Sequence, residues 1–258
     1  MKLENKIVVI TGASSGIGAV TAEMLAKRGA FPVLIARSEE RLKHAARRIE
    51  GPHALYAADV TDGEAVEETF RQIFERHGRV DILLNNAGYG KFEGFTEMPA
   101  EEFDAMMDVN YMGIVRCTKA VVPHMLERGS GQIVNVASMA GKIGSARAVA
   151  YTATKHAVLG FTNALRQELR KSGITVSAVN PGPIDTEFFK RADPSGNYVK
   201  NVSWFMMKPE HVASRIVKMM EKGKEETDLP GLAAVGIRLY GLFPRLADRL
   251  TYKAMNRK

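Results

Sequence analysis

The sequence predicts an α/β protein built on a doubly wound parallel sheet, with helices on both faces. Short apolar runs rich in β-branched residues alternate about six times with stretches of helical periodicity, the order typical of such a sheet. Polar or glycine-rich motifs follow most of these runs, at the strand ends where sheets of this class bind ligands. No change of composition divides the chain, so we expect a single domain over residues 1–258.

The composition is that of an ordinary globular protein, with 45% hydrophobic and 25% charged residues. The one cysteine, Cys117, excludes an internal disulfide and a cysteine-based metal site. With no signal-peptide pattern and no apolar run long enough to cross a bilayer, we expect a cytoplasmic protein without a bound metal. The net charge of +7 comes mainly from residues 211–258, and no basic stripe carries interleaved aromatic residues, so we expect no nucleic-acid partner.

The first strand, predicted at residues 6–11, runs into the sequence G-A-S-S-G-I-G at residues 12–18, and a helical pattern follows over residues 19–28. A glycine-rich turn lets a ligand approach the backbone, and the helix that follows directs unpaired N–H groups toward it. The spacing G-x-x-x-G-x-G differs from the commoner G-x-G-x-x-G. Its position after the first strand nevertheless predicts an anion-binding turn.

The second strand, over residues 32–36, ends at Arg37 and Ser38. Dinucleotide-binding units that hold an unmodified adenosine ribose place a carboxylate near this point, and here an arginine takes its place. Because Arg binds a phosphate through charge-assisted hydrogen bonds, Arg37 favours NADP(H) over NAD(H). The alternative is that Arg37 is a solvated residue ahead of the helix predicted at residues 39–49.

A third strand over residues 53–57 leads to Asp59 and Val60, and after an intervening helix a fourth strand spans residues 81–85. The fourth strand runs into N-N-A-G at residues 85–88. Asparagine side chains satisfy backbone groups and glycine permits close approach, so this strand end suits a ligand. Taken alone, it indicates only a turn.

A long helix is predicted over residues 99–127, with Asn110 inside an apolar stretch. A polar side chain is unfavourable in such a place unless it has a partner. Two interpretations are open: Asn110 satisfies a carbonyl group of the core, or it holds a water molecule in the site.

The fifth strand, over residues 131–137, leads to Ser138, and the helix predicted at residues 150–171 carries Tyr151 and Lys155. Their spacing of four residues puts both side chains on one face of that helix. A fixed ammonium near a phenol favours the phenolate, so we expect Lys155 to lower the pKa of Tyr151 toward neutrality. The pattern Y-x-x-x-K also occurs by chance on solvated helix faces. The other motifs therefore have to show whether this pair belongs to an active site.

A sixth strand over residues 174–180 ends in P-G-P-I-D-T. The motifs now resemble, in their order along the chain, those of the short-chain dehydrogenase/reductase family. They are T-G-A-S-S-G-I-G at 11–18, D-V at 59–60, N-N-A-G at 85–88, V-N at 109–110, the serine at 138, Y-T-A-T-K at 151–155 and P-G at 181–182. The resemblance implies a Rossmann-type oxidoreductase that transfers a hydride between a nicotinamide cofactor and a carbonyl or secondary alcohol.

The resemblance also implies roles for individual residues, with Tyr151 as general acid or base. The residues that look like the family's catalytic tetrad are Asn110, Ser138, Tyr151 and Lys155. The residues expected at the cofactor are Gly12, Ser14, Ser15, Gly16, Ile17, Gly18, Arg37, Ser38, Asp59, Val60, Asn86, Ala87, Gly88, Tyr151, Lys155, Pro181, Gly182, Ile184 and Thr186.

Ser15 departs from the family pattern, because many NADP-dependent relatives carry Lys or Arg just before the second motif glycine. The expected preference for NADP(H) over NAD(H) therefore depends on Arg37, with Ser15 and Ser38 beside it. The family commonly pairs through helices that correspond to residues 99–127 and 150–171, so we expect a homodimer or homotetramer.

A long segment without a regular pattern, residues 187–208, follows the sixth strand. Long loops in compact domains are usually functional. Its aromatic residues would form an apolar lid over the site, which predicts a bulky apolar substrate. The residues expected to contact the substrate are Ser138, Tyr151, Phe188 and Trp204. The alternative is a loop that packs on its own domain.

Apolar residues recur at helical spacing, with basic residues between them, over residues 229–258. We expect a basic amphipathic helical segment there, interrupted at Pro244. Packing against the fold or a partner subunit is the favoured role, and weak contact with an anionic membrane surface is the alternative.

Two other classes of function stay open: a non-enzymatic NADP(H)-sensing or scaffold protein on the same fold, and a lipid-surface binding module built on the C-terminal segment. A sensor needs the glycine turn and Arg37 but has no use for Ser138, Tyr151 and Lys155 together. We therefore predict an NADP(H)-dependent oxidoreductase acting on a small molecule.

Overall fold

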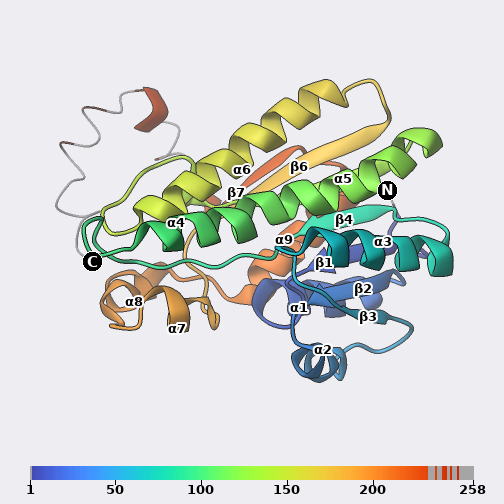
Figure 1. Ribbon diagram of the computed structural model, residues 1–258, viewed down its shortest axis with the longest axis horizontal. Coiled ribbons are helices and arrows are strands. Elements are labelled where there is room, and N and C mark those ends of the chain that lie inside the picture. Colours follow the sequence, from blue (N-terminus) through green and yellow to red (C-terminus); the bar gives the residue numbers. More distant parts are fainter. Residues whose placement is uncertain (1, 232–235, 237–239, 243–244, 246–248, 250–258) are drawn as a thin grey trace.

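Parallel strands form one sheet in the computed structural model, which describes residues 2–231, 236, 240–242, 245 and 249 (Figure 1). Within that part of the chain the strands are β1 (Ile7–Thr11), β2 (Phe31–Ala36), β3 (Ala54–Ala57), β4 (Ile82–Asn85), β5 (Gly131–Val136), β6 (Ile174–Pro181) and β7 (Glu226–Leu229). The first six lie where the apolar runs predict them, and the sheet confirms the predicted fold class. The seventh, β7, escapes prediction because its sequence E-T-D-L contains no apolar run.

The strand order is β3-β2-β1-β4-β5-β6-β7, and every neighbouring pair is parallel. The order reverses between β1 and β4, which pair from Val8 with Ile82 to Ile10 with Leu84. At such a switch point the connections leave toward opposite faces of the sheet and open a crevice at the carboxyl ends. The glycine-rich turn after β1 and the N-N-A-G motif after β4 therefore meet at this crevice.

Helices cover both faces of the sheet. The main ones in the described residues are α1 (Gly16–Ala26), α2 (Glu39–Ala46), α3 (Gly63–His77), α4 (Ala100–Met107), α5 (Gly113–Arg128), α6 (Val149–Glu168) and α9 (Pro209–Lys222). Val8 and Ile10 pack in one core cluster with α1, α2 and α9, whereas Val9 packs in another with α3 and α5. This division follows from the alternation of side chains along a strand, and it explains why successive residues of β1 are all apolar from Ile7 to Ile10.

The helix predicted at residues 99–127 is interrupted near its middle. Asp108–Met112 form a π-helical turn between α4 and α5, and Asn110 is fully buried within it. Turns of this kind are rare and occur frequently at functional sites, because the wider ring redirects side chains. The turn aims Asn110 at the loop that leaves β4.

The segment predicted as a loop at residues 187–208 contains helical structure instead. It forms α7 (Phe188–Ala192), α8 (Asn197–Val202) and a short 3-10 turn at Ser203–Phe205. An isolated bridge between Ile184 and Met207 brings its two ends together. Helices of five and six residues are too short to show a hydrophobic period, which is why the sequence does not predict them. The two helices lie at the end of the molecule where α4 and α6 begin (Figure 1).

The amphipathic segment predicted over residues 229–258 lies largely outside the described residues, so that prediction stays untested. Its first residue, Leu229, ends β7, and its carbonyl accepts a hydrogen bond from the N–H of Gly182 at 2.7 Å. None of the helices in the described part of the chain combines the length and the apolar character that crossing a membrane requires.

Asp81 ties the amino ends of β1 and β4 to the end of α5. Its carboxylate accepts a hydrogen bond from the N–H of Ile7 at 2.9 Å and pairs with Arg79 and Arg128, each at 3.0 Å. Burial on its own raises the pKa of this carboxyl, but the Ile7 N–H and the cations Arg79 and Lys6 together hold it below its usual value. The charged carboxylate therefore stabilises the sheet at the amino ends of its strands, which lie opposite the crevice.

We expect Asp81→Asn to lower the free energy of unfolding by about 2 kcal/mol at neutral pH, because buried polar groups lose a charged partner. Since the folded-state pKa lies below the unfolded value, this stabilisation is present above the unfolded pKa and is lost as the pH falls below about 4. Urea unfolding at neutral and acidic pH measures both effects. Asp104→Asn, which changes an exposed carboxylate on α4, is the control; equal losses in the two variants would contradict the assignment.

Candidate active site

A cavity of about 1080 Å³ opens at the carboxyl ends of the strands. The predicted site residues that line it are Gly12, Ser14, Ser15, Gly16, Ile17, Arg37, Ser38, Asp59, Val60, Asn86, Ala87, Gly88, Ser138, Tyr151, Lys155, Pro181, Gly182, Ile184, Thr186, Phe188 and Trp204. Gly18 and Asn110 lie behind this lining. In the described residues, no group of three or more His, Cys, Asp or Glu side chains is arranged to hold a metal ion. The structure thus brings the sequence motifs together around one cavity.

The turn after β1 is shaped so that the loop after β4 can lie against it. Gly12 has a φ of +64°, and a Cβ there would lie 2.7 Å from the Cα of Ala87. A Cβ on Gly18 would lie 2.6 Å from Nδ2 of Asn86. The Asn86 amide donates hydrogen bonds to the carbonyls of Thr11 and Gly12, at 3.0 and 3.1 Å. Gly18 is therefore needed for this packing, and Asn86 fixes the shape of the turn.

The first turn of α1 leaves its N–H groups available to a ligand. Within the described residues, the Ser15 side chain at the N-cap makes no capping hydrogen bond, and the first turn carries no acidic residue. The unpaired N–H groups and the helix dipole together favour an anion at this point. A turn closed to side chains at Gly12 and Gly18, next to an uncapped helix, fits the phosphates of a dinucleotide.

Arg37 lies at the rim of the cavity beside β2 and β3. Its Nη1 is 3.8 Å from Oδ2 of Asp59, and its side chain is 68% exposed. Ser38 is the N-cap of α2, and its hydroxyl accepts a hydrogen bond from the N–H of Arg41 at 3.2 Å. Arg37 is thus a solvated residue ahead of a helix, as the alternative interpretation states, and it also lines the cavity.

Asn110 fastens the loop after β4 to α6. Its Oδ1 accepts a hydrogen bond from the N–H of Tyr89 at 2.9 Å, and its Nδ2 donates to the Tyr89 carbonyl at 2.8 Å and to Oγ1 of Thr154 at 3.1 Å. A Cβ on Gly88 would lie 3.0 Å from that Oδ1. The interpretation that Asn110 satisfies a carbonyl of the core is therefore confirmed, while the water-binding role stays a prediction.

Lys155 is buried, and its ammonium donates a hydrogen bond to the carbonyl of Val136 at 2.9 Å, at the end of β5. Its Nζ lies 5.7 Å from the centre of the Tyr151 ring. Burial lowers the pKa of Lys155 to about 8, because no carboxylate among the described residues compensates its charge. An anion or a set of hydroxyl groups bound beside Lys155 would stabilise its buried charge.

Tyr151 and Ser138 face each other across the same end of the cavity. Burial raises the pKa of Tyr151 to about 12, and a hydrogen bond with the Ser138 hydroxyl acts in the opposite direction but is weaker. The expected lowering by Lys155 is therefore wrong for this structure, in which loss of solvent around the phenol raises its pKa. The Ser138 hydroxyl also accepts from the N–H of Ala140 at 3.1 Å and donates to the carbonyl of Pro181 at 3.3 Å.

Thr186 connects the start of α1 to the start of α7. Its hydroxyl accepts a hydrogen bond from the N–H of Phe188 at 3.3 Å, and its methyl group lies 3.5 Å from the position of a Cβ on Gly16. Ile184 is 7% exposed and forms part of the wall between these elements and the sheet.

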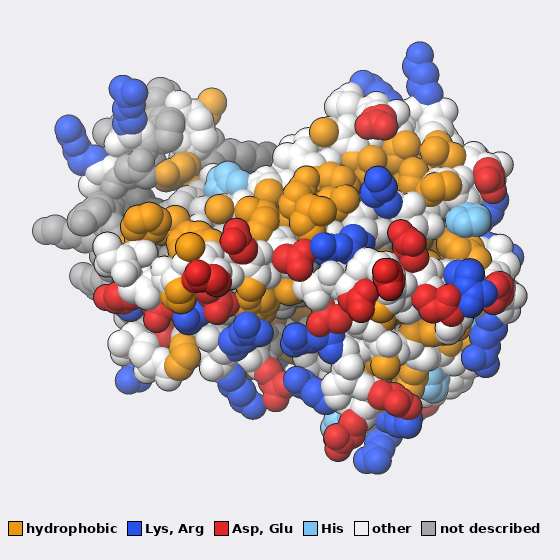
Figure 2. Space-filling model, viewed as in Figure 1, with side chains coloured by type: hydrophobic (Ala, Val, Ile, Leu, Met, Phe, Trp, Pro, Cys, Tyr) orange, Lys and Arg blue, Asp and Glu red, His pale blue; other side chains and the backbone are white. Residues whose placement is uncertain are grey.

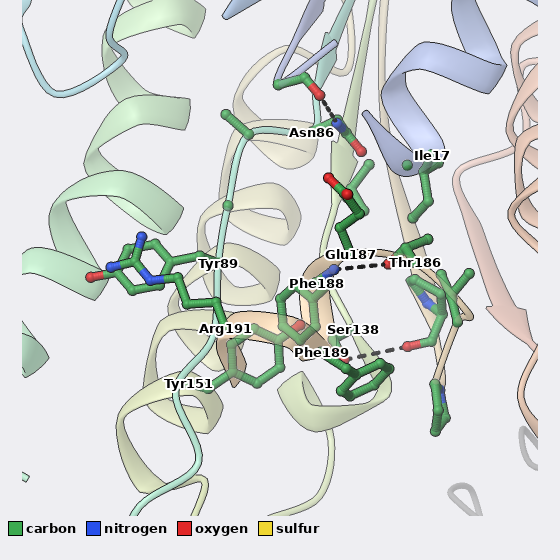
Figure 3. A pocket seen from close by; sticks show the side chains of 18 of the residues that line it. Ile17, Asn86, Tyr89, Ser138, Tyr151, Thr186, Glu187, Phe188, Phe189 and Arg191 are labelled. Carbon is green, nitrogen blue, oxygen red and sulfur yellow. Dashed lines mark hydrogen bonds between the residues drawn. The ribbon is translucent and has the colours of Figure 1, made fainter. Parts of the chain in front are cut away.

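Aromatic side chains close the cavity near Tyr151. Two of them, Phe92 and Tyr198, are not predicted from the sequence. The Phe188 ring lies over the Tyr151 ring, with centroids 5.6 Å apart (Figure 3). Phe92 lies 6.1 Å from Tyr151 and 4.9 Å from Tyr198. Trp204, by contrast, is 84% exposed and lies at the rim. The aromatic cover comes from the loop after β4 and from α7 and α8, so only the tertiary structure reveals it.

A second contact fastens α7 to the body of the domain. The guanidinium of Arg191 stacks on the Tyr89 ring, 3.6 Å from its centre, and lies 3.7 Å from Oε1 of Glu102 (Figure 3). The Tyr89 hydroxyl donates to the same carboxylate at 2.9 Å. Burial, followed by Glu102, raises the pKa of Tyr89 to about 12. The only sequence signal for Tyr89 is its place directly after the N-N-A-G motif.

Comparisons with known proteins point to one family. The model of the short chain dehydrogenase family matches residues 6–196. An uncharacterized oxidoreductase of Staphylococcus saprophyticus is 37% identical over 224 residues, which cover 82% of this chain and 95% of that protein. An uncharacterized oxidoreductase of Bacillus subtilis is 36% identical over an alignment 264 positions long. The alignment covers 98% of this chain and 73% of that protein.

Solved structures show the same architecture. A short-chain dehydrogenase from Streptomyces avermitilis superimposes with a TM-score of 0.85 at 29% identity, covering 98% of each chain. A short chain dehydrogenase/reductase from Burkholderia phymatum in complex with NAD gives a TM-score of 0.88 at 25% identity, covering 95% of this chain and 96% of that one. With its parallel sheet, its glycine-rich turn and these matches, the chain belongs to the short-chain dehydrogenase/reductase family of oxidoreductases.

Proposed function

We propose that the protein uses NADP(H) to transfer a hydride to or from a carbonyl or secondary alcohol of an apolar substrate. The observation that supports this most strongly is the shared cavity. Ser138, Tyr151 and Lys155 converge at one of its ends, and the uncapped start of α1 lies at the other. A sensor or scaffold protein on this fold would need only the second end.

The residues at the first end divide the work of carbonyl reduction. When bound, the dinucleotide supplies the hydride in reduction and accepts it in oxidation. The Tyr151 hydroxyl donates a hydrogen bond to the substrate carbonyl oxygen, and the Ser138 hydroxyl does so after turning its proton away from the Pro181 carbonyl. Both bonds polarise the carbonyl. Tyr151 then gives its proton to that oxygen as general acid, and takes it back as general base in the reverse direction.

Lys155 is proposed to tune Tyr151 once the cavity is filled. Its ammonium offers three N–H donors, of which the Val136 carbonyl accepts one. The others can bind the hydroxyls of the nicotinamide ribose, which would favour the charged lysine and so lower the phenol pKa from its present raised value. The remaining lone pair of Asn110 is proposed to hold the water that returns protons through Lys155.

The preference for NADP(H) over NAD(H) is proposed on the basis of Arg37. Its guanidinium reaches the cavity rim where the adenosine ribose of a dinucleotide would lie, and it is exposed enough to turn toward a phosphate. The Burkholderia phymatum relative is bound to NAD, so the family alone does not decide the matter.

An apolar substrate is proposed because aromatic rings surround the Tyr151 hydroxyl. Phe92, Phe188 and Tyr198 present ring faces and edges rather than charges to the reacting end of the cavity. Phe188 is the proposed substrate contact, whereas the exposed Trp204 would meet only a long substrate that reaches the rim.

A homodimer or homotetramer is proposed from the outer surface. Hydrophobic side chains form a band over α5 and the neighbouring part of α6 on the face shown in Figure 2. Met112, Leu126 and Val149 are among the large hydrophobic residues exposed in the described part of the chain. The reduced, buried Cys117 supports a cytoplasmic location, and the membrane role of the C-terminal segment stays a prediction.

Tyr151→Phe tests the assignment of the general acid. We expect kcat/KM for an apolar ketone to fall by about a thousandfold, because the proton donor is lost, while the Kd for NADPH changes little. Tyr111→Phe, which removes a hydroxyl from a ring packed on Phe161 away from the cavity, is the control. Full turnover by Tyr151→Phe would refute the mechanism.

Arg37→Asp tests the cofactor preference. We expect the ratio of kcat/KM for NADPH to that for NADH to fall by about a hundredfold, since a carboxylate repels the 2′-phosphate. Arg47→Asp introduces the same charge change at the exposed end of α2 and should leave the ratio unchanged. An unaltered ratio in Arg37→Asp would exclude Arg37 from phosphate binding.

Lys155→Met tests whether the lysine is kept at a cost to stability. Its folded-state pKa of about 8 lies below the usual lysine value of 10.5, so the protein carries a buried charge at neutral pH. We expect the variant to melt roughly 3 °C higher at neutral pH and to lose activity. The wild type gains stability as the pH rises from about 8 to 10.5, so the difference should shrink there. A lower melting temperature for Lys155→Met than for the exposed-site control Lys119→Met would contradict this account.

A further inference from the structure

An ion pair crosses the mouth of the cavity between two elements that are far apart in the sequence. Nη2 of Arg41, on α2, lies 2.6 Å from Oε2 of Glu187, which directly precedes α7. The two residues are 146 positions apart, and both line the cavity. The pair therefore connects the helix beside Arg37 to the helix whose first residue, Phe188, covers Tyr151.

Glu187 places a negative charge inside a cavity whose other features attract anions. Its side chain extends into the cavity toward Asn86 and the first turn of α1, where Ile17 lies (Figure 3). Its second oxygen is 3.0 Å from Nζ of Lys190. Lys190 and then Arg41 hold the pKa of Glu187 below its usual value, so the carboxylate is charged at neutral pH. An anionic ligand that enters the cavity therefore meets this carboxylate.

A phosphate on the adenosine side of the cavity needs more cationic charge than Arg37 provides. Arg37 already shares its charge with Asp59, at 3.8 Å. Two other cations of the lining are engaged elsewhere, because Lys155 donates to the Val136 carbonyl and Arg191 stacks on Tyr89. Arg41 lies in the first turn of α2, four residues after Arg37, and also lines the cavity. Its partner Glu187 is exposed enough to be exchanged.

We infer that Arg41 is a second cation for the adenosine 2′-phosphate, and that Glu187 holds it across the cavity mouth until the dinucleotide arrives. The inference rests on the proposed use of NADP(H). The 2′-phosphate takes the place of the Glu187 carboxylate on Arg41 through charge-assisted hydrogen bonds, which a guanidinium forms in bidentate geometry. Glu187 keeps its ion pair with Lys190, so the exchange leaves neither charge without a partner.

The exchange costs little and has a consequence for the substrate end. Both partners are more than half exposed, and ion pairs in that setting contribute little to stability. Losing the Arg41 contact frees Glu187 from α2, and Glu187 precedes the residue that lies over Tyr151. Binding of the 2′-phosphate is thereby coupled to loss of the contact that holds the start of α7, and with it Phe188, to α2.

Isothermal titration of the full-length protein with NADPH, NADH and 2′,5′-ADP tests the inference. In Arg41→Gln we expect the Kd for NADPH and for 2′,5′-ADP to rise by about tenfold relative to the Kd for NADH. In Glu187→Gln we expect NADPH to bind several-fold tighter relative to NADH. That gain should vanish in the double variant, because Glu187 acts on the 2′-phosphate through Arg41.

Arg47→Gln, at the exposed end of the same helix, is the matched control and should change neither Kd. If Arg41→Gln weakens NADPH and NADH equally, or leaves 2′,5′-ADP binding intact, the inference is overturned. If the wild type prefers NADPH and loses that preference in Arg37→Asp but not in Arg41→Gln, the proposed cofactor stands and only the role of Arg41 fails. A wild type that prefers NADH and does not bind 2′,5′-ADP would overturn both.

Discussion

The close contact between the β1–α1 turn and the loop after β4 is the constraint on which the site depends. Oγ1 of Thr11 accepts hydrogen bonds from the N–H groups of Asn86 and Ala87, at 3.0 and 3.1 Å, while the Asn86 amide returns hydrogen bonds to the turn. The absence of a side chain at Gly12 and Gly18 makes this approach sterically allowed. The contact sets the width of the crevice at the switch point and directs the start of α1 into it.

Burial sets the electrostatics at the inner end of the cavity. It lowers the pKa of Lys155, whose charge has no carboxylate partner in the described residues, and it raises the pKa of Tyr151. Groups perturbed by burial and by neighbouring charges cluster at functional sites because the protein retains them against stability. A dinucleotide would offer ribose hydroxyls to Lys155 and, in the proposed exchange, a phosphate to Arg41 in place of Glu187.

The sequence predicts the sheet well because most of its strands are buried on both faces and contain apolar runs, as at residues 7–10. It predicts which motifs line the cavity because these motifs lie at strand ends or at one helical spacing. It does not predict β7, whose polar sequence is held by pairing with β6, nor the short helices α7 and α8. The raised pKa of Tyr151 is not predicted either, because burial of the phenol beside Phe188 is a tertiary effect.

The central claim is that a hydride passes between a nicotinamide and a carbonyl carbon held beside Tyr151. It is tested most directly by incubating the protein with NADPH deuterated at nicotinamide C4, separately in each of the two C4 positions, and an apolar ketone. Mass spectrometry of the alcohol then reports the transfer. The account predicts one deuterium on the carbinol carbon from one of the two labelled cofactors. An alcohol formed without deuterium from either cofactor would contradict it.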